Sequence, residues 1–271
     1  MRLPVHVGWM AVVVAVLSVA GGCAAPRVNP SFAVSRDEAR RDLERIFADP
    51  RPLDRPVVVF AGWADPFFVN THWSKEIRRV SGTDEVRGFS FIFRHDFDRC
   101  RNYVIGTVDD AWPSDDPEWT TEVDVIAFSM GGLVARYSAA PPMTEKGTAR
   151  RLRIRNLYTI STPHRGAKTA WVPTFDRRVV DMRPGSAFLT YLDAAWSDAG
   201  YTLTPYTRLD DPIVGERNTS PPGVTPWWVH TPFLHRAHQE AYLDPRICAD
   251  LLRRLRGETP YTTSPAAALP E

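Results

Sequence analysis

The chain has 271 residues, which is enough to bury a sizeable core, and an α/β domain of this length is ordinary. Its apolar fraction of 44% and charged fraction of 24% are those of a folded soluble protein and exclude a largely disordered chain. The formal net charge is +1, and no basic run with interleaved aromatic residues occurs, so nucleic acid is not an expected partner.

The N-terminus has the layout of an export signal. A short positive start with Arg2 precedes an apolar run from Val7 to Ala20, and two glycines and Cys23 follow. The run is short for a membrane span, which needs about 20 apolar residues. Val19-Ala20-Gly21-Gly22-Cys23 resembles a bacterial lipobox, although Ala20 stands where leucine is usual. We therefore expect a signal peptide over residues 1–22 and a lipid on Cys23, with plain secretion or an uncleaved anchor as alternatives.

This resemblance implies an exported protein that is lipid-anchored to a bacterial membrane, facing the periplasm or the cell surface. Ala24, and not the aspartate that often signals inner-membrane retention, follows Cys23 and weakly favours the outer membrane.

The rest of the chain divides into a tether, a catalytic domain and a tail. Residues 24–34 are interpreted as a tether, and Ser35 with Glu38 predicts a capping box that opens a helix over Arg36–Ala48. We expect the lipidated cysteine, tether and first helix over 23–55, the catalytic domain over 56–257 and a disordered, proline-bearing tail over 258–271.

Strands and helices are predicted to alternate through the catalytic domain. The expected strands cover 57–60, 86–93, 123–127 and 153–160, with weaker candidates over 201–209 and 227–230. The expected helices cover 71–80, 98–112, 132–139, 186–196 and 245–256. This order predicts an α/β fold with a mostly parallel central sheet and helices on both faces.

The strongest chemical signal is Ser129. The buried strand Val123–Ala127 runs into Phe128-Ser129-Met130-Gly131-Gly132, and an apolar helix follows. A tight strand-to-helix turn holds such a serine in a strained conformation, and the flanking Ala127 and Gly131 must be small to avoid collisions. The helix N-terminus supplies N–H groups for an oxyanion. We predict Ser129 to be a nucleophile, the alternative being a capping serine in an ordinary turn.

These residues resemble the α/β-hydrolase superfamily, and in particular bacterial triacylglycerol lipases and esterases. Phe60-Ala61-Gly62-Trp63 stands where the family has a His-Gly pair, with Ala61 in place of the histidine. Ser161-Thr162-Pro163-His164-Arg165-Gly166-Ala167 is similar to the lipases' Thr-Pro-His-x-Gly signature, and 181–189 resembles a later segment of the same enzymes. The resemblance implies an α/β-hydrolase fold, an oxyanion hole at the N–H groups of Trp63 and Met130, and bracing roles for His164 and Arg165.

In this fold the order along the chain is serine, acid, histidine. The family pattern places the acid three residues before a valine, which selects Asp211 before Val214 and leaves Asp210 as a close competitor. His238, before a short turn and Asp244-Pro245-Arg246, resembles the family's catalytic histidine, with His235 and His230 as alternatives.

The expected reaction is hydrolysis of a carboxylic ester, of lipid or lipophilic character, through an acyl-enzyme on Ser129. Alternatives are an acyltransferase, thioesterase or amidase with the same triad, or a catalytically silent binding lipoprotein. No metal or organic cofactor is expected. Segments 161–185 and 215–229 are expected to overhang the sheet. Their aromatic and apolar residues either line an acyl pocket, face a membrane or cover the core: Trp171, Val172, Phe175, Trp227, Trp228 and Val229.

The two remaining cysteines, Cys100 and Cys248, would pair only if their helices approached each other. They are expected on helices that cover opposite faces of the sheet, which argues against a disulfide. Neither has metal-ligand spacing.

Overall fold

A six-stranded sheet forms the centre of the molecule. The computed structural model describes residues 27–271, so the predicted signal peptide and Cys23 lie outside the described residues. The strand order is β2-β1-β3-β4-β5-β6, and all five pairings are parallel. The strands are β1 (Val57–Phe60), β2 (Val86–Phe89), β3 (Val123–Phe128), β4 (Ile154–Ile160), β5 (Thr202–Arg208) and β6 (Trp227–Val229).

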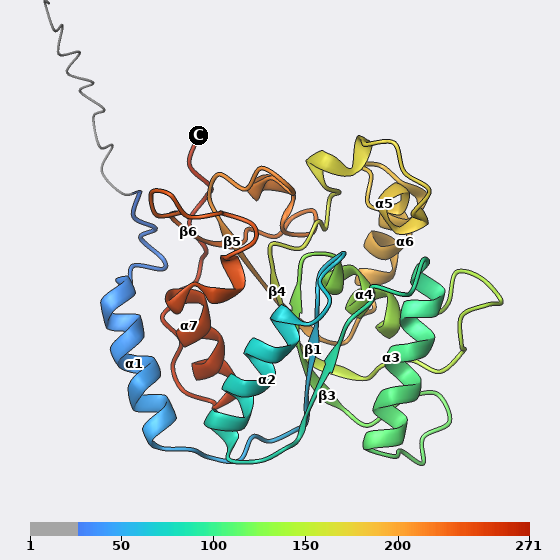
Figure 1. Ribbon diagram of the computed structural model, residues 1–271, viewed down its shortest axis with the longest axis horizontal. Coiled ribbons are helices and arrows are strands. Elements are labelled where there is room, and N and C mark those ends of the chain that lie inside the picture. The colour runs from blue at the N-terminus through green and yellow to red at the C-terminus, as the bar shows by residue number, and fades with distance from the viewer. Residues whose placement is uncertain (1–26) are drawn as a thin grey trace, which may run out of the picture.

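Helices cover both faces of this sheet (Figure 1). On one side lie α1 (Arg36–Ala48), α2 (Phe68–Ser81) and α7 (Pro245–Leu255); on the other lie α3 (Phe97–Ala111), α4 (Met130–Ala139) and α6 (Ala187–Trp196). The short α5 (Arg177–Asp181) and the 3-10 turns η1 (Lys168–Trp171), η2 (Glu216–Asn218) and η3 (Ala241–Leu243) lie in the connections.

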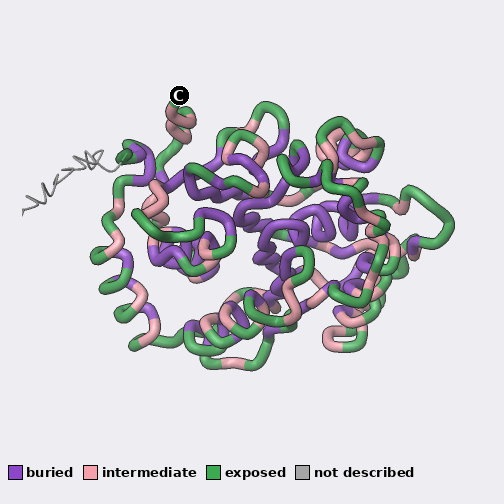
Figure 2. The backbone as a smooth tube through the Cα atoms, turned by 45° about the horizontal axis from the view of Figure 1, so that its top comes forward, coloured by how far each residue is buried: buried purple, intermediate pink, exposed green. Residues whose placement is uncertain are grey.

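β1 is apolar along its whole length, and β3 is apolar except for Asp124, because both strands are buried on both faces. Successive side chains point to opposite sides, so Val58 and Phe60 pack into the core beneath α3 and α4, whereas Val57 and Val59 pack beneath α2 and α7. Figure 2 shows buried segments running through the middle of the molecule and exposed ones around it. The two core layers thus hold the strands in place on both faces of the sheet. The candidate functional side chains lie just beyond the carboxyl ends of these strands.

The local predictions hold best where a cap or a breaker is present. The helix over Arg36–Ala48 is confirmed, with Ser35 and Glu38 forming the capping box. β2 ends at Phe89, four residues earlier than predicted, because residues 90–95 turn away from the sheet. α2 begins at Phe68, three residues earlier than predicted, because the Asp65 carboxylate accepts hydrogen bonds from the N–H groups of Phe68 and Val69.

The tail and part of the tether differ from their predictions, since both pack on the domain. The buried Asp250 carboxylate accepts a hydrogen bond of 2.8 Å from the N–H of Thr262, and the Trp228 indole donates to the carbonyl of Ala268 at 3.0 Å. Asn29 donates to the carbonyl of Trp228 at 2.8 Å. The tail is rich in small residues and proline, and this composition is typical of disordered segments. Its hydrogen-bond partners lie far away in the sequence, so composition alone does not reveal that it is ordered.

The cysteines lie where the sequence predicts them, in α3 and α7. Cys100 is buried in the core cluster on one face of the sheet and Cys248 in the cluster on the other, and both are free thiols. Burial raises the pKa of the Cys100 thiol to about 12, so it stays protonated at neutral pH. From residue 27 onward, no helix has the length and apolar character needed to cross a bilayer.

Candidate active site

Ser129 occupies a sharp turn between β3 and α4. Its backbone has φ 51° and ψ −127°, a conformation that L-residues rarely adopt and that is held only by the surrounding packing. A Cβ on Gly131 would lie 2.7 Å from the carbonyl oxygens of Phe60 and Ala61, so no larger residue fits there. The turn therefore needs a small residue after the serine, as the sequence indicates.

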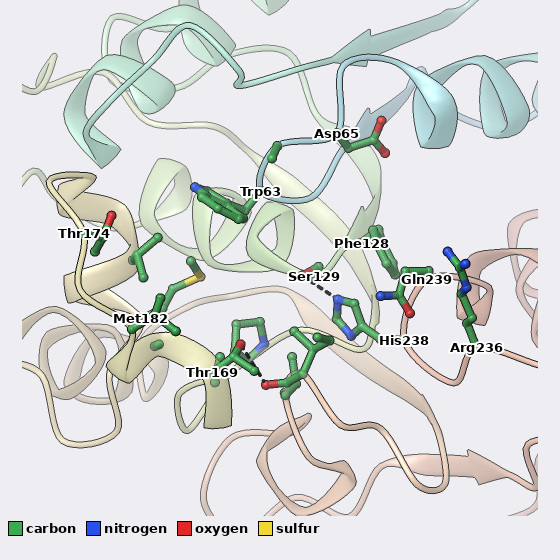
Figure 3. Close-up of a pocket in the computed structure, with 18 of the residues that line it drawn as sticks. Trp63, Asp65, Phe128, Ser129, Thr169, Thr174, Met182, Arg236, His238 and Gln239 are labelled. Carbon is green, nitrogen blue, oxygen red and sulfur yellow. Dashed lines mark hydrogen bonds between the residues drawn. The ribbon is translucent and has the colours of Figure 1, made fainter.

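Three side chains that the sequence singles out are hydrogen bonded in series. His238 Nε2 lies 3.0 Å from Ser129 Oγ, and His238 Nδ1 lies 2.8 Å from Asp211 Oδ2 (Figure 3 shows the first contact). The other oxygen, Asp211 Oδ1, accepts hydrogen bonds from the N–H groups of Ile213 and Val214 at 2.9 and 3.0 Å. With its proton on Nδ1, the imidazole has a free lone pair at Nε2 to accept the serine proton.

The acid of this series is ionised. Burial alone would raise the pKa of Asp211, but the hydrogen bond and charge of His238 and the two backbone N–H groups outweigh it, so the pKa lies below its ordinary value. A buried carboxylate with three donors is fixed in orientation and fixes the imidazole in turn.

The competing residues lie elsewhere. Asp210 is exposed and has a positive φ of 62°. His235 pairs with Glu240 at 2.5 Å, and its side chain is 41% exposed. His230 is hydrogen bonded neither to Ser129 nor to Asp211. The structure thus brings together Ser129, Asp211 and His238, and none of these three competitors.

Backbone N–H groups beside Ser129 form a candidate oxyanion hole. A Cβ on Gly62 would lie 3.1 Å from the Ser129 Cβ, so the loop after β1 passes directly over the serine. Met130 is the first residue of α4, where N–H groups have no intrahelical partner. Within the described chain, neither the N–H of Met130 nor that of Trp63 donates to another backbone or side-chain acceptor. Both are free to bind an anionic oxygen.

A mostly apolar cavity of about 720 Å³ opens over the triad. Ser129 and His238 lie at its floor, and Figure 3 shows Trp63 and Met182 on the side away from Arg236 and Gln239. One wall comes from the segment between β4 and α6, through Ala170, Val172, Val179 and Met182. A cavity of this size with few polar groups suits a small lipophilic ligand.

This wall answers one question that the sequence leaves open. The segment over 161–185 does overhang the sheet, and Val172 lines the cavity while Trp171 and Phe175 are exposed. By contrast, Trp227, Trp228 and Val229 form β6 and are buried, so that they cover the core.

Two features of the chain around His238 were not predicted from the sequence. The Phe128 ring lies 5.1 Å from the imidazole, measured between ring centroids. Arg208, fully buried at the end of β5, pairs with Asp244 at 2.9 Å, and Asp244 also pairs with Arg246 and caps α7. An arginine near the end of a predicted strand is the signal that could have indicated this buried ion pair.

His164 lies below the site and is a structural residue. Its imidazole is fully buried between Arg136 Nη1, at 3.2 Å from Nδ1, and Thr159 Oγ1, at 3.1 Å from Nε2. Burial, together with the charges of Arg136 and Arg165, lowers its pKa well below the ordinary value, so the ring is neutral. It bridges β4 and α4, the helix that begins directly after Ser129, in agreement with the bracing role expected for it. Arg165 donates to the carbonyl of Pro221 at 3.0 Å.

Comparison with known proteins agrees with this arrangement. Residues 93–180, which include Ser129, match the model of a family described as "Putative serine esterase (DUF676)". The Bacillus licheniformis lipase BlEst2 in its mature form superposes with a TM-score of 0.51 at 12% identity, covering 79% of this chain and 95% of the lipase. The chain has the α/β-hydrolase fold.

A second solved structure superposes with a lower TM-score. The phospholipase PlaB of Legionella pneumophila in complex with thio-NAD has a TM-score of 0.46 at 15% identity, covering 61% of this chain. This chain spans 44% of the length of that phospholipase. No curated protein matches the sequence. Across residues 27–271, no cluster of three or more histidine, cysteine, aspartate or glutamate side chains is arranged to hold a metal ion.

Proposed function

We propose that the protein is a serine hydrolase that cleaves carboxylic esters through an acyl-enzyme on Ser129. The observation that carries the proposal is the Ser129–His238–Asp211 series at the floor of an apolar cavity. An esterase family model that spans Ser129 supports the same reaction.

The reaction follows from the geometry. Ser129 Oγ attacks the ester carbonyl carbon while His238 Nε2 takes the hydroxyl proton, and Asp211 stabilises the imidazolium that results. The N–H groups of Trp63 and Met130 bind the oxyanion, an effect worth roughly 3 kcal/mol per donor. His238 then returns the proton to the leaving alcohol as the C–O bond breaks. Water, deprotonated by His238, attacks the acyl-enzyme and releases the acid and Ser129.

We propose that the substrate is lipophilic. Large apolar side chains are exposed on segments that follow the carboxyl ends of four strands: Phe67 and Phe68 after β1, Phe93 after β2, Phe175 after β4, and Phe233 and Leu234 after β6. Because the sheet is parallel, these segments gather at one edge, the edge at which the cavity opens. Exposed apolar patches of this kind are typical of surfaces that bind lipids or other apolar partners.

We also propose that the enzyme is exported and that a lipid on Cys23 anchors it to a bacterial membrane. The outer membrane is weakly favoured. Support comes from the lipobox-like sequence and from the path of the chain, because Asn29 is hydrogen bonded beside β6. Figure 1 shows this part of the chain at the same end of the molecule as α5 and the segments above the sheet. A short tether from Cys23 would therefore keep the cavity near the bilayer.

The test is ester hydrolysis by the full-length protein, with p-nitrophenyl esters from short to long acyl chains and a fluorophosphonate label. We expect turnover and labelling at Ser129, both abolished in Ser129→Ala. Ser138→Ala is the matched control, since Ser138 is buried on α4, the helix that follows Ser129, and its hydroxyl has no partner within the described chain. A folded protein without turnover or label would contradict the proposal. Faster acyl transfer to an added alcohol than to water would favour an acyltransferase.

A further inference from the structure

The Trp63 side chain makes a contact that its backbone role does not require. The indole is 48% exposed, yet its Nε1–H donates to Asp176 Oδ2 at 2.7 Å. Trp63 follows β1 and Asp176 lies on the segment between β4 and α6. An exposed indole needs no protein partner, because water satisfies its single donor. The hydrogen bond therefore joins two loops that are far apart in the sequence.

Asp176 is itself rigidly held. Arg178 donates to Asp176 Oδ2 at 2.6 Å and to Oδ1 at 3.0 Å, and the N–H of Arg178 caps the same Oδ1 at 3.0 Å. Arg178 is only 3% exposed, and its Nη1 donates to the carbonyl of Phe91 at 2.7 Å, just beyond β2. A bidentate ion pair that is itself anchored gives the carboxylate a fixed position. The Trp63 indole is thus tied to a rigid point.

This tie acts on two parts of the proposed site at once. The loop that Trp63 belongs to passes over Ser129, and the next residue, Ala64, has a positive φ of 58°. Such a backbone is held only by its surroundings. Asp176 lies within the segment whose Val172, Val179 and Met182 form the cavity wall. The same hydrogen bond therefore joins the oxyanion loop to the wall against which an acyl chain would lie.

We propose that Asp176 is a positioning residue, whose hydrogen bond to the Trp63 indole aims the Trp63 N–H at the oxyanion. The inference rests on the proposed function, because it concerns the developing charge of the same reaction. Asp176 does not touch the substrate. It acts through Trp63, and Arg178 holds it in place.

Two substitutions break the same bond from opposite sides. Trp63→Phe keeps the backbone N–H and the ring but removes the indole donor. In Asp176→Asn, with the amide oxygen on the cap and Arg178 Nε, the amide N–H₂ faces two donors, the indole and Arg178 Nη2, so the bond to the indole is lost. Since displacement of one oxyanion donor costs less than its complete loss, we expect each variant to lower kcat about tenfold. KM should stay within about twofold, because ground-state binding barely uses the oxyanion hole.

The readout that separates positioning from general damage is transition-state affinity. In the full-length protein, a trifluoromethyl ketone should bind each variant more weakly by the same factor by which kcat/KM falls, whereas a non-hydrolysable ether of the same chain length should bind unchanged. The double variant should lose no more than either single variant, because both remove one bond. Trp196→Phe, an indole on α6 away from the cavity, should leave the rate unchanged.

Several results would overturn the proposal. Unchanged kcat in both single variants, multiplicative losses in the double variant, or a raised KM at constant kcat would each do so, provided that thermal melts show folded protein. A wild-type protein that is folded but hydrolyses no ester, with Ser129→Ala indistinguishable from it, would instead remove the proposed function and this inference with it. If the wild type is active and Trp63→Phe and Asp176→Asn keep its kcat, this inference alone is removed.

Discussion

Asp211→Asn provides the sharpest test of the hydrogen-bonded series, because the structure predicts how the new side chain would sit. Asp211 Oδ1 accepts two backbone N–H groups, so the asparagine oxygen must remain there. The amide N–H₂ then faces His238 Nδ1, which is forced to act as an acceptor. The proton moves to Nε2, the atom 3.0 Å from Ser129 Oγ, and the imidazole can no longer accept the serine proton.

The expected loss is large for a change of one atom. A wrong imidazole tautomer lowers kcat by about 10⁴-fold in serine proteases, equivalent to about 5 kcal/mol of transition-state stabilisation. The fold should survive, because the two backbone hydrogen bonds are kept. KM should change little, since Asp211 is only 1% exposed and is removed from the substrate.

The assay is p-nitrophenyl ester hydrolysis at neutral pH, compared with Asp210→Asn. Asp210 is the matched control, because it is adjacent, exposed and has a positive φ that asparagine tolerates. It should keep its full rate. If Asp211→Asn retained more than a tenth of the activity, or if Asp210→Asn lost as much, the reasoning from hydrogen-bond polarity would be refuted.

Three further predictions concern stability, measured by urea denaturation. Gly132→Ala should destabilise the fold by about 1–3 kcal/mol or more, because its Cβ would lie 2.2 Å from Thr162 Oγ1, whereas Gly106→Ala on α3, with nothing within 4 Å, should stabilise it by about 0.5–1 kcal/mol. His164 stays neutral when folded but takes up a proton when unfolded below about pH 6.5. Its contribution to the free energy of unfolding should therefore fall with decreasing pH by about 1.4 kcal/mol per unit, and His164→Gln should show a slope shallower than the wild type by that amount. Equal slopes would mean that the ring titrates normally. Removing residues 261–271 should cost roughly 1–3 kcal/mol by stripping Asp250 of the Thr262 donors, and an unchanged denaturation midpoint would show that the tail contributes nothing.

The sequence predicts the architecture and the triad residues well because their signals are local. The turn at Ser129 is a run of five residues, 128–132, in which the turn requires small side chains beside the serine. The candidates Asp211 and His238 follow from the order along the chain and from their immediate neighbours. Strand burial is equally predictable, since a continuous apolar run such as Val57–Phe60 is stable only when both of its faces are buried.

The contacts that tie distant segments together were not predictable in this way. Trp63 and Asp176 are 113 positions apart on irregular loops, and nothing in either neighbourhood specifies the partner. The tail failed as a prediction for the same reason, since Thr262 is ordered by Asp250 and residue 263 by the carbonyl of Ser31, 232 positions away. Composition indicates how much apolar surface a segment can bury by itself. These segments are instead ordered by hydrogen bonds to buried polar groups of distant segments, which would otherwise have no partner.

Backbone strain concentrates at the end of the sheet that carries the triad. Ser129 follows β3, Ser161 follows β4 and Asp210 lies two residues beyond β5, and each of them has a positive φ. Each such residue costs on the order of 1–3 kcal/mol and persists only where its surroundings over-determine it. Here three neighbouring parallel strands, buried on both faces, supply that constraint and end at the same edge. Ser129 itself has this strained backbone, and Asp210 has it immediately before the buried Asp211. The core layers beneath therefore hold the strand ends from which Ser129 and Asp211 extend toward His238.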